Sequence, residues 1–347
     1  MKNLTKYLLF FILISSMIII AGCSKSTSDE GEYIIEAKEV KDYMNKQEVV
    51  IVDMQKPEDY AKGHLAGAVN ITLQNIVINI PVPNMLAPKE QIEVVLGAKG
   101  IGNDTSILIY DNNNNMEAAR MFWTLQVYGH QNIKVISGGI KAIEAAKLEI
   151  NTEIPVVSSV KYTTKDKNTN IIATIEEVKA QASEPKSNTV ILDTRTPEEF
   201  AEGNIPGSIL MNYLDNNYFD NTYKSVQDIK IRYIENKVTT DKQVIMYCKT
   251  SVRAAQTYLA LYNAGYRNLK VYDGAWLEWD LSLNPPAPVV EPTVEAPVVE
   301  TPAQTSEPKT PAPSTGDKPK ESTPAPKPTP KPTPPAPPVE PGKTDNS

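Results

Sequence analysis

Cysteine and histidine are scarce in this chain, which has two of each among 347 residues. Two cysteines are too few for a disulfide framework, and His64 and His130 lie far apart in apolar sequence, so no metal-binding cluster is visible. No histidine follows His130, which argues against a Cys–His protease in the second half. We expect packing or turn roles for both histidines. The formal net charge of −7 argues against nucleic acid as a partner.

The first cysteine, Cys23, ends a segment with the features of an export signal. The segment has a basic start, residues 7–20 are almost wholly apolar, and its ending IAGC resembles the bacterial lipobox. We therefore expect residues 1–22 to be a lipoprotein signal peptide, and a lipid on Cys23 to hold the protein at the extracytoplasmic face of the membrane. An uncleaved membrane anchor is the alternative, although the apolar segment is short for a span.

Proline is concentrated at the other end of the chain, where residues 285–347 contain 20 of its 28 prolines. This segment has no aromatic residue and too little apolar surface to offset the entropy cost of ordering. We expect a disordered, extended tail with much polyproline II conformation, which serves as a spacer or contacts the cell envelope. A ligand for a proline-binding module is the alternative.

The middle of the chain contains a repeat. VVIVDMQKPEDYAKGHLAGAVNI, which begins at Val49, matches TVILDTRTPEEFAEGNIPGSILM, which begins at Thr189. Farther on, SILIYDNNNNMEAARMFW matches QVIMYCKTSVRAAQTYLA. Ordered identity of this kind predicts two copies of one domain. The expected domains cover residues 35–150 and 171–284, with linkers at residues 23–34 and 151–170.

Each copy alternates between strand and helix patterns. The apolar runs VVIVD and TVILD predict buried strands, and the P-E-[ED]-[YF]-A that follows each predicts the start of a helix. The runs SILIY and QVIMY lead through a polar loop into an amphipathic helix that ends at Gly129 or Gly265. This alternation predicts an α/β fold with a mainly parallel sheet flanked by helices in each domain. Ligands bind at the carboxyl ends of such strands, and Cys248 directly follows one.

Several features of the loop CKTSVR, which begins at Cys248, indicate a reactive cysteine. Successive backbone N–H groups in a tight loop can form a nest for negative charge, and the helix start adds its positive dipole end. The full charges of Lys249 and Arg253 also favour the thiolate over the thiol. The first copy has Asp111 and four asparagines here, without a thiol or a cation. If the position served only packing, the copies should agree, so we interpret Cys248 as a nucleophile and the Asp111 loop as structural.

These motifs together resemble a tandem-domain rhodanese, a member of the sulfurtransferase family, over roughly residues 35–284. The resemblance includes DTRTPEEF at Asp193, GNIPGS at Gly203, the Cys-x-x-x-x-Arg loop, GYRNLKV at Gly265 and an Asp-Gly…Trp ending at Asp273. In such proteins the N-terminal copy commonly lacks the cysteine and the C-terminal copy carries catalysis, and this chain follows that pattern.

The resemblance implies a ping-pong reaction without cofactor or metal. The Cys248 thiolate would take the outer sulfur of thiosulfate as a persulfide and pass it to cyanide or a cellular thiol. Implied substrate-binding residues are Lys249, Thr250, Ser251, Val252, Arg253 and Arg195.

The chain departs from the family pattern at two positions of the site. Ser251 stands where many rhodaneses have glycine, which could strain the turn or shift one N–H group. Glu199 stands where many two-domain members have a second substrate-binding arginine, which leaves the choice of donor open. Arg195 has a structural alternative, an ion pair with a carboxylate near the strand end. The flanking cations favour thiosulfate over 3-mercaptopyruvate, whose enzymes tend to lack a cation beside the cysteine.

Two other classes of protein compete with a sulfurtransferase. Related phosphatases and arsenate reductases use a Cys…Arg loop that is one residue longer and wraps a tetrahedral oxyanion. The other competitor is a non-catalytic sulfane-sulfur-binding module of the envelope, with the tail as its working part. Turnover of phosphate without thiosulfate would favour the first, and a reduced protein without any sulfur transfer would favour the second.

The lipobox generates the first prediction. A Cys23→Ser variant should be released from the membrane or retained as the longer precursor, because serine cannot accept the lipid thioether. Membrane fractionation combined with the size of the mature protein measures this. A variant that stays in the membrane fraction at the mature size would contradict the prediction.

Overall fold

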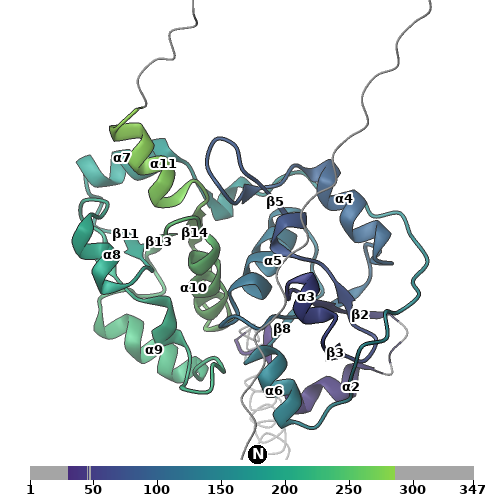
Figure 1. Ribbon diagram of the computed structural model, residues 1–347. Helices are drawn as coiled ribbons and strands as arrows, with labels where there is room; N and C mark the ends of the chain where they lie inside the picture. The colour runs from purple at the N-terminus through teal and green to yellow at the C-terminus, as the bar shows by residue number, and fades with distance from the viewer. Residues whose placement is uncertain (1–29, 45, 47, 286–347) are drawn as a thin grey trace, which may run out of the picture. The chain divides into compact units, whose positions relative to one another are not determined.

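The computed structural model describes residues 30–44, 46 and 48–285 (Figure 1). Cys23, the signal segment and the proline-rich residues from 286 onward lie outside the described residues. In the described part no helix is both long and apolar enough to cross a bilayer. The described residues form two α/β domains, each with a parallel sheet flanked by helices, as the repeat predicts.

The first domain is built on a five-stranded sheet with the order β1-β8-β7-β2-β4, and every neighbouring pair in it is parallel. These strands are β1 (Ile34–Ile35), β2 (Val49–Asp53), β4 (Val69–Asn70), β7 (Ser106–Tyr110) and β8 (Ile133–Ile136). The helices of this domain are η2 (Ala37–Val40), α2 (Lys41–Met44), α3 (Pro57–Tyr60), η3 (Leu73–Asn75), α4 (Lys89–Ala98), α5 (Met116–Val127) and α6 (Gly139–Ala145). Two short antiparallel pairs complete it: β3 (His64–Leu65) with β9 (Ile150–Asn151), and β5 (Val77–Ile78) with β6 (Met85–Leu86).

The second domain repeats this plan with the strand order β10-β14-β13-β11-β12, again entirely parallel. Its strands are β10 (Ile172–Ala173), β11 (Thr189–Asp193), β12 (Ile209–Leu210), β13 (Gln243–Tyr247) and β14 (Leu269–Tyr272). Its helices are η4 (Thr169–Ile171), α7 (Ile175–Ser183), α8 (Pro197–Glu202), η5 (Tyr213–Asn216), α9 (Val226–Glu235), α10 (Val252–Asn263) and α11 (Ala275–Leu283). Proline occupies the first turn of both α3 and α8, which confirms the predicted helix starts.

The register of the central strands places the loop after β13 beside the end of β11. Asp193 pairs with Tyr247, so Thr194 and Cys248 leave the sheet at the same level. In the first domain Asp53 pairs with Tyr110 in the same way. The carboxyl edge of each sheet therefore brings together one loop that leads into α3 or α8 and one that leads into α5 or α10.

Helices α5 and α10 are more completely buried than their predicted amphipathic pattern alone would suggest. The two helices pack against each other and join the cores of the two domains (Figure 1). Phe122 and Leu261 lie in this shared core, and a fully buried side chain of this size contributes about 1.5–3 kcal/mol to folding. Both helices end just before the predicted glycines, Gly129 and Gly265, which have φ angles of 78° and 89°.

Candidate active site

Cys248 follows β13 directly and is completely buried at the start of the loop that leads into α10. The start of helix α11 contacts this loop. The N–H groups of Trp276 and Leu277 donate to the carbonyl oxygens of Cys248 and Lys249 at 2.9 and 3.3 Å. The backbone N–H groups of residues 249–253 donate to no acceptor within the described residues. Successive amides that are not otherwise hydrogen-bonded, at a helix start, form a site for an anion next to the sulfur.

In the corresponding loop of the first domain the acceptor for these amides belongs to the chain itself: it is the Asp111 carboxyl group, whose pKa is raised by burial. The Asp111 carboxylate accepts hydrogen bonds from the N–H groups of Asn113, Asn115 and Ala118 at 2.9, 3.0 and 3.1 Å. Asn115 has a left-handed backbone, which asparagine tolerates better than most residues. The first loop is therefore an amide nest that is filled by its own side chain, in keeping with the structural role expected for it.

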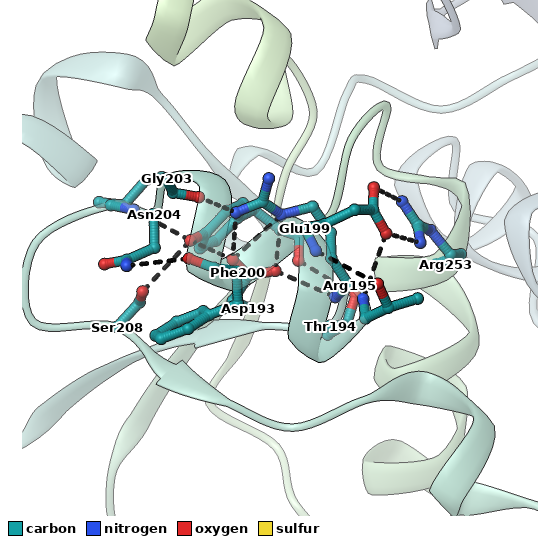
Figure 2. Close-up of polar contacts among 12 residues, drawn as sticks. Asp193, Thr194, Arg195, Glu199, Phe200, Gly203, Asn204, Ser208 and Arg253 are labelled. Atoms are coloured by element: carbon teal, nitrogen blue, oxygen red, sulfur yellow. Dashed lines mark hydrogen bonds and ion pairs between the residues drawn. The ribbon is translucent and has the colours of Figure 1, made fainter.

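The two cations predicted to bind substrate have different surroundings. Arg253 donates from Nη1 and Nη2 to the two carboxylate oxygens of Glu199 at 2.6 and 2.8 Å (Figure 2). These hydrogen bonds lower the pKa of Glu199 to about 2, so the pair stays ionised across the physiological range. The Lys249 side chain is exposed and forms no hydrogen bond or ion pair in the part of the chain that the structure describes. Lys249 is thus the cation whose charge is available to a bound anion.

Arg195 takes up the structural position that the sequence left open as an alternative to substrate binding. Its guanidinium donates to Asp193 at 2.6–3.1 Å and to the Gly203 carbonyl oxygen at 2.6 Å (Figure 2). The first domain has the same network with Gln55 in place of the arginine, where Gln55 donates to Asp53 and to the Gly63 carbonyl oxygen. Because this network also occurs in the domain without a thiol, it stabilises the turn after the strand and does not depend on a substrate.

The loop residues between the two cations are held in place from the first domain. Ser251 is completely buried with φ 66°, and its Oγ accepts a hydrogen bond from Arg120 Nη1 at 2.6 Å. The Thr250 hydroxyl accepts one from the Asn84 side chain at 3.0 Å. Val252 opens α10 with a buried, apolar side chain, so only its backbone N–H can donate to a polar ligand. The serine that replaces the family's glycine therefore has a left-handed backbone and a hydroxyl bonded across the domain interface.

Arg120 is the residue of this site that the sequence reasoning missed. It is completely buried on α5, and its Nη2 donates to Asp273 at 2.7 Å and to the Asn84 carbonyl oxygen at 2.9 Å. Asp273 also accepts from the Leu86 N–H at 2.7 Å. One signal in the sequence could have indicated Arg120. The repeat aligns it with the neutral Gln256, and a charged side chain within an apolar helix needs a partner.

Neither histidine takes part in this site. His64 is buried and stacked on Tyr60, and its ring nitrogens contact the carbonyl oxygens of Tyr60 and Glu153. His130 contacts the Tyr162 hydroxyl and the Thr105 carbonyl oxygen. Both have the packing roles that the sequence predicts. Among the described residues, no group of three or more histidine, cysteine or acidic side chains could hold a metal ion.

Comparison with known proteins identifies the family. The rhodanese-like domain matches the chain twice, over residues 36–146 and 174–282. The chain belongs to the rhodanese-like family. The chain is 30% identical over 266 residues to a protein of Saccharopolyspora erythraea named "Putative thiosulfate sulfurtransferase", and the match covers 72% of this chain and 93% of that protein. It is 26% identical over 269 residues to the sulfur carrier protein TtuD of Thermus thermophilus, with 72% and 93% covered.

Solved structures agree on the fold of this rhodanese. SseA from Escherichia coli, described among the 3-mercaptopyruvate sulfotransferases, superimposes with a TM-score of 0.62 at 24% identity and covers 70% of this chain and 98% of that one. An anaerobic ergothioneine biosynthesis enzyme from Chlorobium limicola superimposes with a TM-score of 0.63 at 18% identity, over 71% and 68% of the two chains. At these identities the likeness establishes the tandem fold alone.

The buried contacts of Arg120 generate a prediction about stability. Arg120→Ala should lower the free energy of unfolding by about 3–5 kcal/mol, because it leaves the Asp273 carboxylate buried without its ion pair. Arg120→Lys should recover only part of the loss, since a single ammonium cannot reach the same acceptors in the same geometry. Urea denaturation measures both. Arg232→Ala, which breaks a more exposed pair with Asp215, is the control and should cost at most about 1 kcal/mol; equal losses would contradict the prediction.

A second prediction concerns Glu117, which lines a cavity of about 700 Å³ in the first domain. Burial, and then the neighbouring Asp111 carboxylate, raise the pKa of Glu117 from 4.5 to about 7. The folded protein therefore binds this proton more tightly than the unfolded chain, so stability should fall as the pH rises from about 4.5 to about 7 and then level off. Glu117→Gln should remove this decline and be more stable than wild type at pH 8, by on the order of 1–3 kcal/mol.

Thermal or urea unfolding across this pH range measures the effect of Glu117. Glu58→Gln removes the same charge from an exposed position that lines the same cavity, and serves as the control. The prediction fails if Glu117→Gln and wild type lose stability in parallel between acid and neutral pH.

Proposed function

We propose that the protein is a sulfurtransferase that moves sulfane sulfur from thiosulfate to a thiophilic acceptor through a persulfide on Cys248. One observation carries the proposal. The amides that surround a carboxylate in the first domain have counterparts around Cys248 that are not hydrogen-bonded within the described residues. The same fold thus provides an anion site next to a nucleophilic atom in one domain only.

The chemistry proceeds in two balanced steps. The Cys248 thiolate attacks the outer sulfur of thiosulfate, a sulfur–sulfur bond to the enzyme forms, the bond inside thiosulfate breaks, and sulfite leaves with the electron pair. The acceptor then attacks the outer sulfur of the persulfide and restores the thiolate; cyanide becomes thiocyanate and a thiol becomes a persulfide. Both steps hold negative charge beside the sulfur, which the loop amides and Lys249 stabilise.

The relatives support this choice of reaction class. The relative from Saccharopolyspora erythraea bears a thiosulfate sulfurtransferase name, and the exposed cation Lys249 favours an anionic donor. The alternative donor is 3-mercaptopyruvate, to which the name of the SseA structure refers. The similarity to a sulfur carrier protein supports the alternative, a non-catalytic carrier of sulfane sulfur. Phosphate chemistry is disfavoured because the loop has one residue fewer than a phosphatase loop and because its arginine is paired with Glu199.

The place of the reaction is also part of the proposal. The lipobox supports attachment of the protein to the extracytoplasmic face of the cell membrane through Cys23, with the proline-rich tail in contact with the envelope. A donor and acceptor on that side of the membrane would then meet the enzyme there.

Mass spectrometry of the reduced protein after incubation with thiosulfate tests the function. One added sulfur atom should appear on the peptide that contains Cys248, and subsequent cyanide should remove it with release of thiocyanate. A Cys248→Ser variant is the control and should gain no sulfur. An unmodified Cys248 after exposure to thiosulfate and to 3-mercaptopyruvate would overturn the proposal, and retention of the sulfur in the presence of cyanide and thiols would favour the carrier.

A further inference from the structure

The ion pair between Glu199 and Arg253 lies beside the candidate active site. The pairing reduces the positive charge that is available there to a bound anion. Glu199 is in the first turns of α8, where its N–H and its carboxylate bond to Thr196, the residue that caps the helix. Arg253 is in the first turn of α10, and both of its terminal nitrogens bond to Glu199 (Figure 2). The two side chains are only partly exposed, at 17% for Arg253 and 28% for Glu199. A two-bond contact of this kind, with each partner in the first turn of a helix, is among the stronger ion pairs and has a specific geometry.

Arg253 also interacts with Cys248. Burial of the guanidinium opposes its charge, yet the pKa of Arg253 is raised above its ordinary value, because its hydrogen bonds to Glu199 and the charge of Cys248 outweigh the effect of burial. The guanidinium therefore interacts with both the Cys248 sulfur and the Glu199 carboxylate. A donor that approaches Cys248 experiences both members of the pair.

The charges around the loop show what this placement does to a donor. Arg195 is neutralised by Asp193 and Arg253 by Glu199, which leaves Lys249 as the full positive charge without a partner in the described structure. Thiosulfate carries two negative charges and approaches a thiolate that carries a third. One free cation and the loop amides can compensate one negative charge of a donor, whereas a second charge has no unpaired cation of its own in the described structure and is repelled by the nearby Glu199 carboxylate.

We propose that Glu199 is a specificity-determining residue: the site accepts thiosulfate, and Glu199 makes it accept sulfane donors with a single negative charge more efficiently than this dianion. The inference rests on the proposed sulfur transfer through Cys248. The favoured class contains organic thiosulfonates and persulfides. In a thiosulfonate, attack by the Cys248 thiolate on the outer sulfur breaks the sulfur–sulfur bond, and a sulfinate leaves with the electron pair. In a persulfide, a thiolate leaves in the same way, so the enzyme reaches the same intermediate from each donor.

The test compares two donors in one preparation of the full-length enzyme. The ratio of kcat/KM for thiosulfate to kcat/KM for methanethiosulfonate, with cyanide as the acceptor, does not depend on the fraction of active protein. Glu199→Gln removes the negative charge and keeps the shape, so it should raise this ratio about tenfold, the effect expected of one nearby, partly exposed charge. Added salt should reduce the increase, because screening weakens such charges.

Two matched variants separate charge from structure. Glu198→Gln changes the net charge equally on an exposed neighbouring position of α8 and should leave the ratio within about twofold of wild type. Arg253→Gln leaves the Glu199 carboxylate without its partner, so it should lower the ratio, and Glu199→Gln in the same chain should reverse that fall. Glu199→Asp keeps the charge and should keep the low ratio even if the geometry of the pair changes.

The outcomes distinguish the inference from the proposed function. If wild type accepts sulfur from both donors and Glu199→Gln leaves their ratio unchanged, or lowers both rates equally, Glu199 has only a structural role and the inference is overturned. If neither donor places sulfur on Cys248 of wild type, the proposed function itself fails.

Discussion

The packing of α5 against α10 joins the two domains and fixes where each of their loops begins. Each of these helices starts at the loop that follows the central strand of its own domain. Because side chains from both helices lie in one shared core, neither loop can move without disturbing the other domain. The domain without a thiol is in this way a structural part of the site, and it also supplies Arg120 and Asn84 to the loop of the second domain.

The two loops that follow β7 and β13 differ in how their backbone N–H groups are satisfied. A strand that ends in a tight loop before a helix exposes several N–H groups, and buried N–H groups need acceptors. In the first domain, Asp111 supplies the acceptor from within and the loop becomes closed to ligands. In the second domain the equivalent residue is Cys248, and an anion bound at the sulfur would supply the acceptor. We therefore propose that a thiol in place of the carboxylate, in a loop that is one residue shorter, changes a self-satisfied turn into a site for chemistry.

The pairing of charges around Cys248 is the basis for the kind of anion that we propose this site accepts. Each of three arginines has a carboxylate partner: Arg120 with Asp273, Arg195 with Asp193, and Arg253 with Glu199. The first two pairs are buried and hold the loop and the turn after β11 in place, whereas the third is partly exposed and lies beside the sulfur. Because each of these arginines is paired, the net positive charge around Cys248 is smaller than the sequence suggests. Lys249 therefore contributes a larger part of the positive charge that is available to an anion.

The sequence by itself determined the architecture and the place of Cys248 at the carboxyl edge of the second sheet. The repeat, the strand patterns and the prolines at the helix starts predicted two α/β domains, and the loop after QVIMY predicted the position of Cys248, because these signals are local. Only the tertiary structure decided the partners of the charged residues. Glu199 and Arg253 are 54 residues apart, and Arg120 and Asp273 are 153 residues apart, so their pairing depends on how helices from different parts of the chain meet. The nearly complete burial of α5 and α10 could not be predicted from their amphipathic pattern for the same reason, since the second buried face of each helix exists only where the two domains pack together.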